Sequence, residues 1–320
     1  MISVTAETFK LAETFTLARG SRSEANVLTV RVARHGSTGW AECVPYARYG
    51  ESLESVTAQI MRLPADISRQ ALQEALPPGA ARNAVDCALW DLAAKQSATP
   101  VWQLAGLSRP SAQITAFTLS LDSPQNMRAA AARHAARPLL KIKLGTSSDL
   151  PRLEAVRAGA PDARIIVDAN EGWSPAVYAA LIPHLVRLGV EMLEQPFASG
   201  QDAALAEVDR PITVCADESC HDRASLNDLI GKYDMVNIKL DKTGGLTDAL
   251  ALRDQALAAG FQIMVGCMVG SSLAMAPAVL VAQNAAITDL DGPLLLAEDR
   301  EVPLLFDAEG VHPADAALWG

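Results

Sequence analysis

Leu139–Asp168 reads LLKIKLGTSSDLPRLEAVRAGAPDARIIVD. It contains two short β-rich apolar runs, Leu139–Leu144 and Arg164–Asp168, separated by a helical segment rich in Ala and Leu. Each run carries a charged residue near its end, and these two markers, Lys143 and Asp168, lie 25 residues apart. That spacing is the length of one βα unit with short loops. The stretch therefore predicts a parallel β–α–β unit.

The same pattern recurs along the chain from about residue 112 onward, with steps of 22 to 27 residues between successive markers. The predicted strands are Ile114–Ser120, Leu139–Leu144, Arg164–Asp168, Glu191–Glu194, Ile212–Asp217, Met235–Leu240, Gln262–Gly266 and Ala286–Asp291. Their apolar runs are nearly continuous, as in parallel strands covered on both faces. Eight such strands predict a (β/α)₈-type barrel. The alternative is an open doubly wound sheet, whose nucleotide-binding versions lack support because neither G-x-G-x-x-G nor a P-loop motif occurs.

Residues 1–111 have a different pattern and predict an α+β unit in front of the barrel. We expect strands over residues 2–9 and 25–33, and helices over Ser52–Arg62 and Gly79–Lys95. The C-terminal tail, from about Asp299, is predicted to return to this unit. The predicted domains are an α+β capping domain, residues 1–111 with the tail 299–320, and a barrel catalytic domain, residues 112–298.

The composition restricts the classes of partner. The chain has 27 basic and 37 acidic residues, a net charge of −10, which argues against nucleic acid and anionic membranes. Its five cysteines form no C-x-x-C pair, so we do not expect a disulfide framework. We expect the protein to act in a reducing cytoplasm. The N-terminus has neither the basic nor the apolar region of a signal peptide.

One stretch favours a membrane at first sight. No charged residue lies between Asp254 and Asp289, and Ile263–Ala282 has the length of a membrane span. Gly266, Gly270 and Pro277 interrupt it, however. We therefore prefer a buried strand followed by a packed helix.

Charged residues are rare in parallel barrel strands, and their positions here indicate a catalytic site. Lys141 and Lys143 are two residues apart on one strand and share a face. Asp168, Glu194 and Asp217 end three successive strands, so they should meet at the rim where barrel active sites lie. Three carboxylates there repel one another unless a cation binds them, and Mg²⁺ is the expected ion, one per chain.

Lys239 is four strands from the first lysine pair and should face it across the metal. Lysines act as bases when burial and positive charge depress their pKa. A metal acidifies the α-proton of a bound carboxylate by stabilising the enediolate. With a lysine on each face, one removes the proton and the other returns it. The pattern therefore predicts racemisation or epimerisation.

Each element also has a structural interpretation. An Asp at a strand end is typical of a helix N-cap, and a K-x-K pair is typical of a solvated edge strand. Three carboxylates on consecutive strands, with lysines on both sides, are hard to explain in that way.

These residues also resemble a known family. The motifs Lys141-x-Lys143, Asp168-Ala-Asn, Glu194-Gln-Pro, Asp217-Glu-Ser and Lys239-x-x-Lys-x-Gly-Gly resemble those of the enolase superfamily, in its muconate-lactonising-enzyme-like subgroup. The resemblance covers nearly the whole chain. It implies a (β/α)₇β modified TIM barrel under a cap built from both chain ends. It also implies that Asp168, Glu194 and Asp217 bind Mg²⁺, that Lys143 and Lys239 are the acid/base pair, and that Lys141 supports Lys143.

Two further groups point to the substrate. Asp289 and Asp291, on the last strand, share a face and suit a substrate ammonium; the alternative is the Asp-Gly-Pro turn. This Asp-x-Asp is similar to that of dipeptide epimerases acting on L-Ala-D/L-Glu, the members that the chain resembles most. Of the cap arginines Arg19, Arg22 and Arg48, we expect Arg22 to hold a distal carboxylate.

These features predict a dipeptide X-Glu as the substrate. The resemblance implies L-Ala-L-Glu and L-Ala-D-Glu, and murein peptides contain L-Ala-D-Glu. Thr118 and Met268 are expected to line the pocket, although simple packing also explains Met268. The alternative within the scaffold is an N-acyl amino acid racemase or another muconate-lactonising-like enzyme. A non-catalytic metal-binding or membrane-associated protein is the alternative outside it. Self-association into a homo-oligomer stays open.

Overall fold

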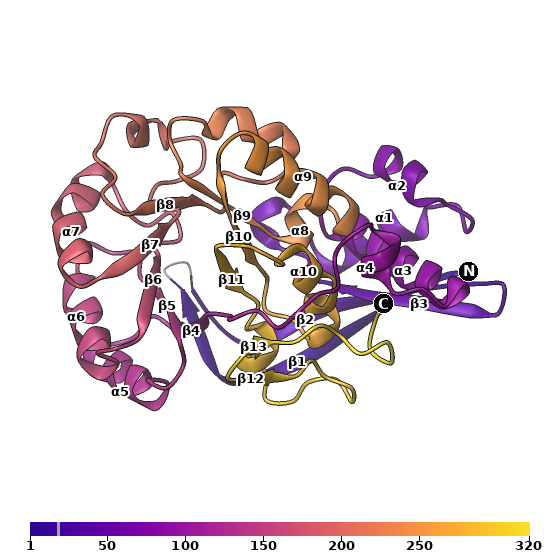
Figure 1. Ribbon diagram of the computed structural model, residues 1–320, viewed down its shortest axis with the longest axis horizontal. Helices are drawn as coiled ribbons and strands as arrows, with labels where there is room; N and C mark the ends of the chain where they lie inside the picture. Colours follow the sequence, from indigo (N-terminus) through magenta and orange to yellow (C-terminus); the bar gives the residue numbers. More distant parts are fainter. Residues whose placement is uncertain (18–19) are drawn as a thin grey trace.

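A parallel sheet of eight strands forms the body of the protein, in a computed structural model that describes residues 1–17 and 20–320. The strands neighbour one another in chain order: β4 (Phe117–Leu119), β5 (Leu139–Lys143), β6 (Arg164–Asp168), β7 (Val190–Glu194), β8 (Thr213–Ala216), β9 (Met235–Ile238), β10 (Gln262–Gly266) and β11 (Ile287–Asp289). A parallel bridge between Thr115 and Thr288 joins the first strand to the last. The sheet therefore closes into the predicted barrel (Figure 1).

Helical segments connect the barrel strands on the outside (Figure 1). The α-helices are α5 (Pro124–Arg133), α6 (Leu150–Gly159), α7 (Pro175–Arg187), α8 (Leu240–Thr243), α9 (Leu246–Ala258) and α10 (Ser272–Val281). Ser123 and Ser174 cap α5 and α7, and a proline follows each cap, a combination that favours helix initiation. After β7 and β8 the expected helices are only 3₁₀ segments, η2 (Ala203–Ala206) and η3 (Arg223–Leu229).

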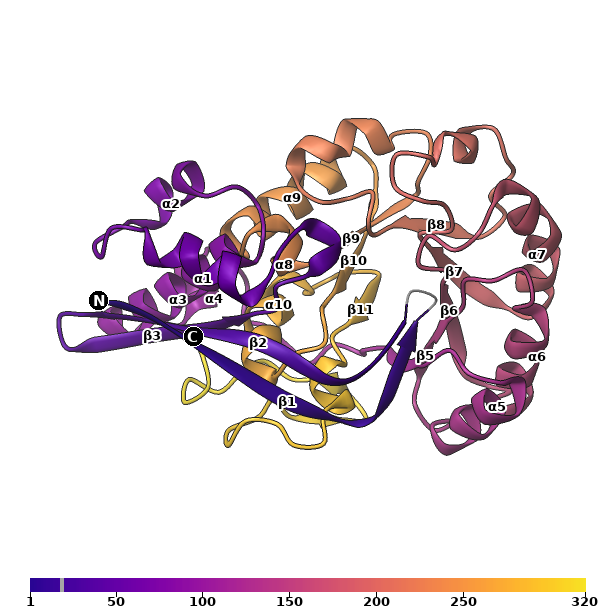
Figure 2. The ribbon, with the colours of Figure 1, turned by 180° about the vertical axis from the view of Figure 1, so that it is seen from behind.

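The N-terminal unit is an antiparallel sheet with helices packed on it. Its strands are β1 (Ile2–Leu17), β2 (Gly20–Arg34) and β3 (Ser37–Cys43), and its helical segments are η1 (Ala47–Tyr49), α1 (Leu53–Met61), α2 (Arg69–Ala75), α3 (Ala80–Ser97) and α4 (Val101–Leu104). Of these, β3, η1, α2 and α4 were not expected from the sequence. The far ends of β1 and β2 extend to the barrel (Figures 1 and 2), where the Leu121 amide donates to the Thr16 carbonyl at 3.0 Å.

The C-terminal tail contacts the N-terminal unit. After β11 the chain passes through η4 (Gly292–Leu295), and the tail that follows contains β12 (Phe306–Asp307) and β13 (Gly310–Val311). The Trp40 indole donates to the Leu318 carbonyl at 2.5 Å, and the Trp319 indole donates to the Cys87 carbonyl at 3.2 Å.

The long uncharged stretch forms the buried strand and helix predicted for it. Gly266 ends β10, and α10 is covered along nearly its whole length. Among the described helices, none is long and apolar enough to cross a membrane.

The barrel interior is built in layers, because alternate residues of each strand point inward. At one level each strand contributes one buried apolar side chain, and together these form a single cluster. This apolar layer consists of Ala116, Leu139, Ile166, Met192, Cys215, Met235, Met264 and Ile287. Two residues further along each strand lies a second layer, which is mostly polar. This polar layer consists of Thr118, Lys141, Asp168, Glu194, Asp217, Asn237, Gly266 and Asp289.

Candidate active site

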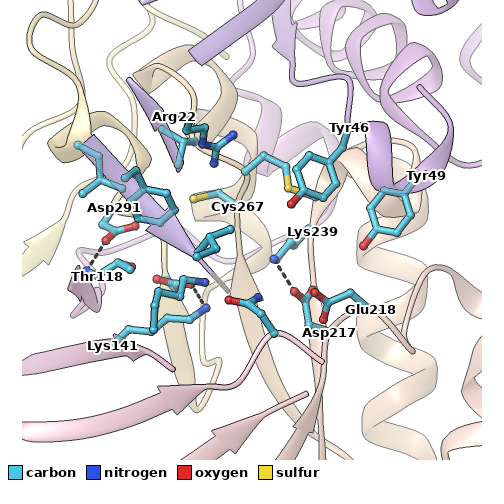
Figure 3. A pocket seen from close by; sticks show the side chains of 18 residues that line it. Arg22, Tyr46, Tyr49, Thr118, Lys141, Asp217, Glu218, Lys239, Cys267 and Asp291 are labelled. Atoms are coloured by element: carbon cyan, nitrogen blue, oxygen red, sulfur yellow. Dashed lines mark hydrogen bonds and ion pairs between the residues drawn. The ribbon is translucent and has the colours of Figure 1, made fainter. Parts of the chain in front are cut away.

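The polar layer lies at the carboxyl ends of the strands. Two residues further along their strands come the next side chains that point inward, Lys143, Lys239 and Asp291. The lysines and carboxylates there are all at least 92% buried, with exposed fractions between 0% for Asp168 and 8% for Lys239. Most of them line one pocket together with side chains from the cap (Figure 3). Asp168 and Glu194 do not line it themselves but contact the lysines that do. Barrel enzymes place their active sites at this end.

Lys141 is the centre of the ionic contacts on one side of the pocket. Its ammonium lies 2.6 Å from a Glu194 oxygen, 2.7 Å from Asp289 and 3.3 Å from Asp168. Lys143 lies 2.6 Å from the same Asp168 oxygen. Although burial acts in the opposite direction, the charges of Lys143 and Lys141 lower the pKa of Asp168 to about 2.

Across the barrel, Lys239 follows β9 and contacts Asp217 at 2.7 Å (Figure 3). The depressed lysine pKa expected from the sequence requires a neighbouring positive charge, and the charges beside Lys239 in this structure are those of carboxylates. Burial acts to lower its pKa, but the charges of Asp217 and Glu194 outweigh this and raise it well above the usual value. The carboxylates therefore dominate the electrostatics of this side of the pocket.

Lys242 is a residue of this site to which the sequence analysis gave no role. Its side chain is fully buried and donates to the Asp217 carboxylate at 2.7 Å, to the Asp217 carbonyl at 2.6 Å and to the Asn237 carbonyl at 2.9 Å. It therefore ties the ends of β8 and β9 together and holds the Asp217 side chain. Its signal in the sequence is the second lysine of the Lys-x-x-Lys-x-Gly-Gly motif.

The three carboxylates of the predicted metal site lie close enough to repel one another. Burial, with the negative charge of Asp168, raises the pKa of Glu194 to about 7, and Asp217 adds to this rise. In residues 1–17 and 20–320, no three His, Cys, Asp or Glu side chains already have the arrangement of a metal site. Each of the three carboxylates instead has a lysine ammonium within 2.7 Å. Buried, mutually repelling carboxylate oxygens are nevertheless the donors that fit a hard divalent cation.

Gln195 holds the rim of the pocket in place. Its side-chain oxygen accepts the amides of Asp217 at 2.9 Å and Ser219 at 3.1 Å. Its backbone, like that of Asn170, has a positive φ, 37° and 44° respectively. Left-handed conformations of residues other than glycine are costly and collect at functional sites. The Gln195 role was not predicted, although the Glu-Gln-Pro sequence contains the signal.

Asp289 and Asp291 lie together at one end of the pocket. Asp291 accepts the Thr118 amide at 2.6 Å (Figure 3), and burial, with the charge of Asp289, raises the pKa of Asp291 to about 7. One Asp289 oxygen contacts Lys141, whereas the other is buried and has no hydrogen-bond partner among the described residues. A further cation at this end of the pocket would satisfy both carboxyls.

The three cap arginines differ in position. Arg22 reaches the pocket, where its guanidinium lies 5.4 Å from the centre of the Phe15 ring and makes no ion pair within the described part of the chain. Arg48 instead pairs with Glu171 at 2.6 Å. Arg19 lies outside the described residues.

Thr118 and Met268 line the pocket, as expected, and Tyr49 and Cys267 were not predicted to do so. Burial, together with the negative charge of Asp217, raises the pKa of the Tyr49 hydroxyl well above its usual value. Tyr49 comes from η1 of the cap and closes the pocket beside Glu218 (Figure 3).

Two protein families match the chain. Residues 1–106 match "Mandelate racemase / muconate lactonizing enzyme, N-terminal domain", and residues 126–311 match "Enolase C-terminal domain-like". An L-Ala-D/L-Glu epimerase of Escherichia coli is 47% identical, over 97% of this chain and 99% of its own. An N-acetyl-D-glutamate racemase of a Pseudoalteromonas species is 46% identical, over 92% of this chain and 95% of its own.

Solved structures agree with these relatives. An enolase family member from Agrobacterium tumefaciens with homology to dipeptide epimerases, bound to sodium and L-Ala-L-Glu, has a TM-score of 0.97 and 52% identity, covering 100% of this chain and 99% of its own. A dipeptide epimerase from Enterococcus faecalis, complexed with Mg and L-Leu-L-Tyr, has a TM-score of 0.90 and 28% identity, covering 99% of this chain and 97% of its own.

Proposed function

This chain belongs to the enolase superfamily, in its mandelate racemase and muconate lactonizing enzyme family, and from that premise we propose that it is an epimerase interconverting L-Ala-L-Glu and L-Ala-D-Glu. The observation that carries the proposal is the placement of lysines on opposite sides of one pocket. Lys143 ends β5, and Lys239 follows β9, four strands away. A substrate between them has one amine on each face of its α-carbon.

In the proposed reaction, one of these lysines takes the α-proton of the glutamate residue and the other delivers a proton to the opposite face. Lys141, held by Glu194 and Asp289, has the position to orient the substrate α-carboxylate. We propose that Asp168, Glu194 and Asp217 hold one Mg²⁺. When bound, this ion supplies positive charge that stabilises the negative charge left on the substrate carboxylate by loss of the α-proton.

The two ends of the dipeptide have separate partners. The unpartnered Asp289 oxygen and the Asp291 carboxyl suit the N-terminal ammonium, since both are buried and a charge-assisted hydrogen bond is strongest there. Arg22, on the cap side, suits the glutamate side-chain carboxylate, because it reaches the pocket without an acidic partner among the described residues.

A second candidate is N-acyl amino acid racemisation, favoured by the 46% identity to an N-acetyl-D-glutamate racemase. An N-acylated substrate has no ammonium and does not need Asp289 or Asp291 as anions. Asp289→Asn and Asp291→Asn should therefore reduce turnover of a dipeptide and spare that of N-acetyl-glutamate. A wild type that turns over N-acetyl-glutamate better than the dipeptide, with this activity intact in both variants, would favour the racemase.

We also propose that the enzyme acts in the cytoplasm on peptides released from murein, which contain L-Ala-D-Glu. All five cysteines are free thiols, and four of them are buried, as suits a reducing compartment.

The experiment is proton NMR of L-Ala-L-Glu with the purified protein and Mg²⁺ in D₂O. We expect loss of the glutamate α-proton signal and appearance of L-Ala-D-Glu, both abolished by EDTA. N-acetyl-L-glutamate serves as the parallel substrate. Exchange in N-acetyl-glutamate with none in the dipeptide would overturn the proposal in favour of the second candidate.

A further inference from the structure

A second hollow adjoins the active-site pocket. It has a volume of about 360 Å³ and lies between β1, β4, α5 and η4. Three side chains, Phe15, Thr118 and Leu295, line both this hollow and the active-site pocket. They therefore form a wall with one cavity on each side, and we call these three residues the partition.

The partition is anchored at the end of the pocket that holds the two aspartates. The Thr118 amide donates to Asp291 at 2.6 Å. Phe15 is 6% exposed and packs in a cluster with Leu11, Val269 and Leu296. Because Thr118 and Asp291 are in direct contact, any group bound at Asp291 lies next to the partition.

The hollow behind the partition has apolar side chains on its inner wall and polar or charged side chains toward solvent, among them Asp122, Asn126 and His134. Its inner surface includes Phe117, Leu119 and Met127, which are 9%, 2% and 1% exposed. At the opening, Arg133 lies 3.4 Å from Glu13, and both side chains are more than half exposed. Such a lining suits an apolar side chain whose far end approaches solvent.

We propose that the partition restricts the first residue of the dipeptide to a small side chain, and that a larger apolar side chain occupies the hollow once the partition is opened. This rests on the proposed function, in which Asp289 and Asp291 hold the N-terminal ammonium. The ammonium is bonded to the first α-carbon, so the first side chain starts beside Thr118. A methyl group fits in front of the wall, whereas a leucine side chain has to cross it.

The test compares L-Ala-L-Glu with L-Leu-L-Glu in the wild type and in Leu295→Ala, measuring kcat/KM by NMR in D₂O. A matched control is Leu294→Ala, because Leu294 lines the hollow without lining the active-site pocket. We expect the wild type to favour the alanine dipeptide by at least about 10- to 200-fold, the range for a single methylene in an apolar pocket. Leu295→Ala should shift this preference at least tenfold toward leucine, mainly through KM, and Leu294→Ala should leave it unchanged.

If Leu295→Ala does not fold, Phe15→Leu is the second variant, because it makes the same wall smaller by a conservative change. It should also shift the preference toward the leucine dipeptide. The inference is overturned if the wild type uses both dipeptides equally, if Leu294→Ala and Leu295→Ala shift the preference alike, or if neither partition variant gains activity on the leucine dipeptide. These results differ from failure of the proposed function, in which the wild type does not epimerise L-Ala-L-Glu.

Discussion

The apolar and polar layers of the barrel lie two residues apart on the same eight strands, yet they have opposite energetics. Ile166 and Asp168 on β6 illustrate the difference, since both are completely buried. Burying the isoleucine removes apolar surface from water and stabilises the fold. Burying the carboxylate costs free energy by itself, and the charges of Lys143 and Lys141 have to offset that cost, as the lowered pKa of Asp168 shows that they do. The apolar layer therefore stabilises the barrel, and the stability of the barrel holds the charges of the polar layer in place.

We expect the largest effect on activity from a substitution in the polar layer, Glu194→Gln. The amide keeps an oxygen for the Asn237 side chain, which donates to Glu194 at 2.7 Å, but it loses the 2.6 Å ion pair with Lys141. It also relieves repulsion from Asp168 and Asp217. The two changes act in opposite directions on stability, so the net change should be small. The loss of one anionic metal ligand should lower kcat/KM by about 10³-fold, the scale of removing one electrostatic group.

Steady-state kinetics with a Mg²⁺ titration, alongside thermal unfolding, checks this separation. Activity within tenfold of the wild type would contradict the role given to the polar layer.

The opposite result is expected from Ile166→Ala in the apolar layer. Ile166 is fully buried directly below Asp168, so the substitution leaves a cavity and should cost about 2–5 kcal/mol of unfolding free energy. Urea unfolding measures this, with Ile166→Val as the milder control at about 1 kcal/mol. Activity per folded molecule should fall less than tenfold. A larger loss of activity at unchanged stability would erase the distinction between the layers.

A buried carboxyl outside both layers should make the free energy of unfolding depend on pH. Asp241, in α8, accepts the Asn83 side chain at 2.7 Å and the Val44 amide at 3.1 Å, and burial raises its pKa to about 7. Since this exceeds the unfolded value of about 3.9, the folded state binds the proton more tightly. Its contribution is therefore complete below about pH 4 and is lost as the pH rises toward 7.

Asp241→Asn retains an acceptor oxygen and cannot ionise. Between about pH 4 and 7, the wild type should lose up to about 1.4 kcal/mol per pH unit relative to this variant. Urea unfolding at several pH values measures the slopes, and Asp254→Asn, at an exposed carboxylate, serves as the control. Parallel slopes for the wild type and Asp241→Asn would contradict the assignment.

We expect the smallest effect from Lys242→Met, and it is an effect on Mg²⁺ affinity. This variant tests a residue that holds a side chain of the polar layer in place. The substitution removes the three contacts that hold Asp217 and the end of β9. Loss of a group that orients a metal ligand should weaken Mg²⁺ binding by about 10- to 100-fold. Isothermal titration of Mg²⁺ measures this without turnover.

The matched control is Lys232→Met, since Lys232 makes a comparable 2.7 Å ion pair with Asp202 away from the pocket. Equal Mg²⁺ affinity in both variants would exclude a positioning role for Lys242.

The period-two alternation explains why so much of the barrel could be predicted. A charged residue two positions beyond an apolar one is conspicuous on a strand that is covered on both faces. The sequence alone therefore places Lys141, Asp168, Glu194 and Asp217 at one end of the barrel interior. Their ionic contacts could not be predicted, because the pairing of Lys141 with Asp289 joins strands 148 residues apart. The direction of the Lys239 pKa shift also depends on such contacts, because Asp217 and Glu194 raise it.

The cap was less predictable than the barrel. Its arginines lie in loops, and the partner of a long side chain there depends on which part of the barrel lies opposite. Arg48 accordingly pairs with Glu171, a contact across 123 residues, whereas Arg22 reaches the pocket. The short strand β3 and helix α2 have weak local patterns, and the domain boundaries at residues 111 and 298 stay a prediction.

The central claim is that two lysines act on opposite faces of one α-carbon, and proton exchange in single-lysine variants tests it most directly. Lys143→Ala and Lys239→Ala are incubated with L-Ala-L-Glu and with L-Ala-D-Glu in D₂O with Mg²⁺, and the glutamate α-proton is followed by NMR. We predict that neither variant interconverts the epimers and that any residual exchange is confined to one epimer in Lys143→Ala and to the other in Lys239→Ala. Full epimerisation by either variant, or exchange of the same epimer in both, would contradict the account.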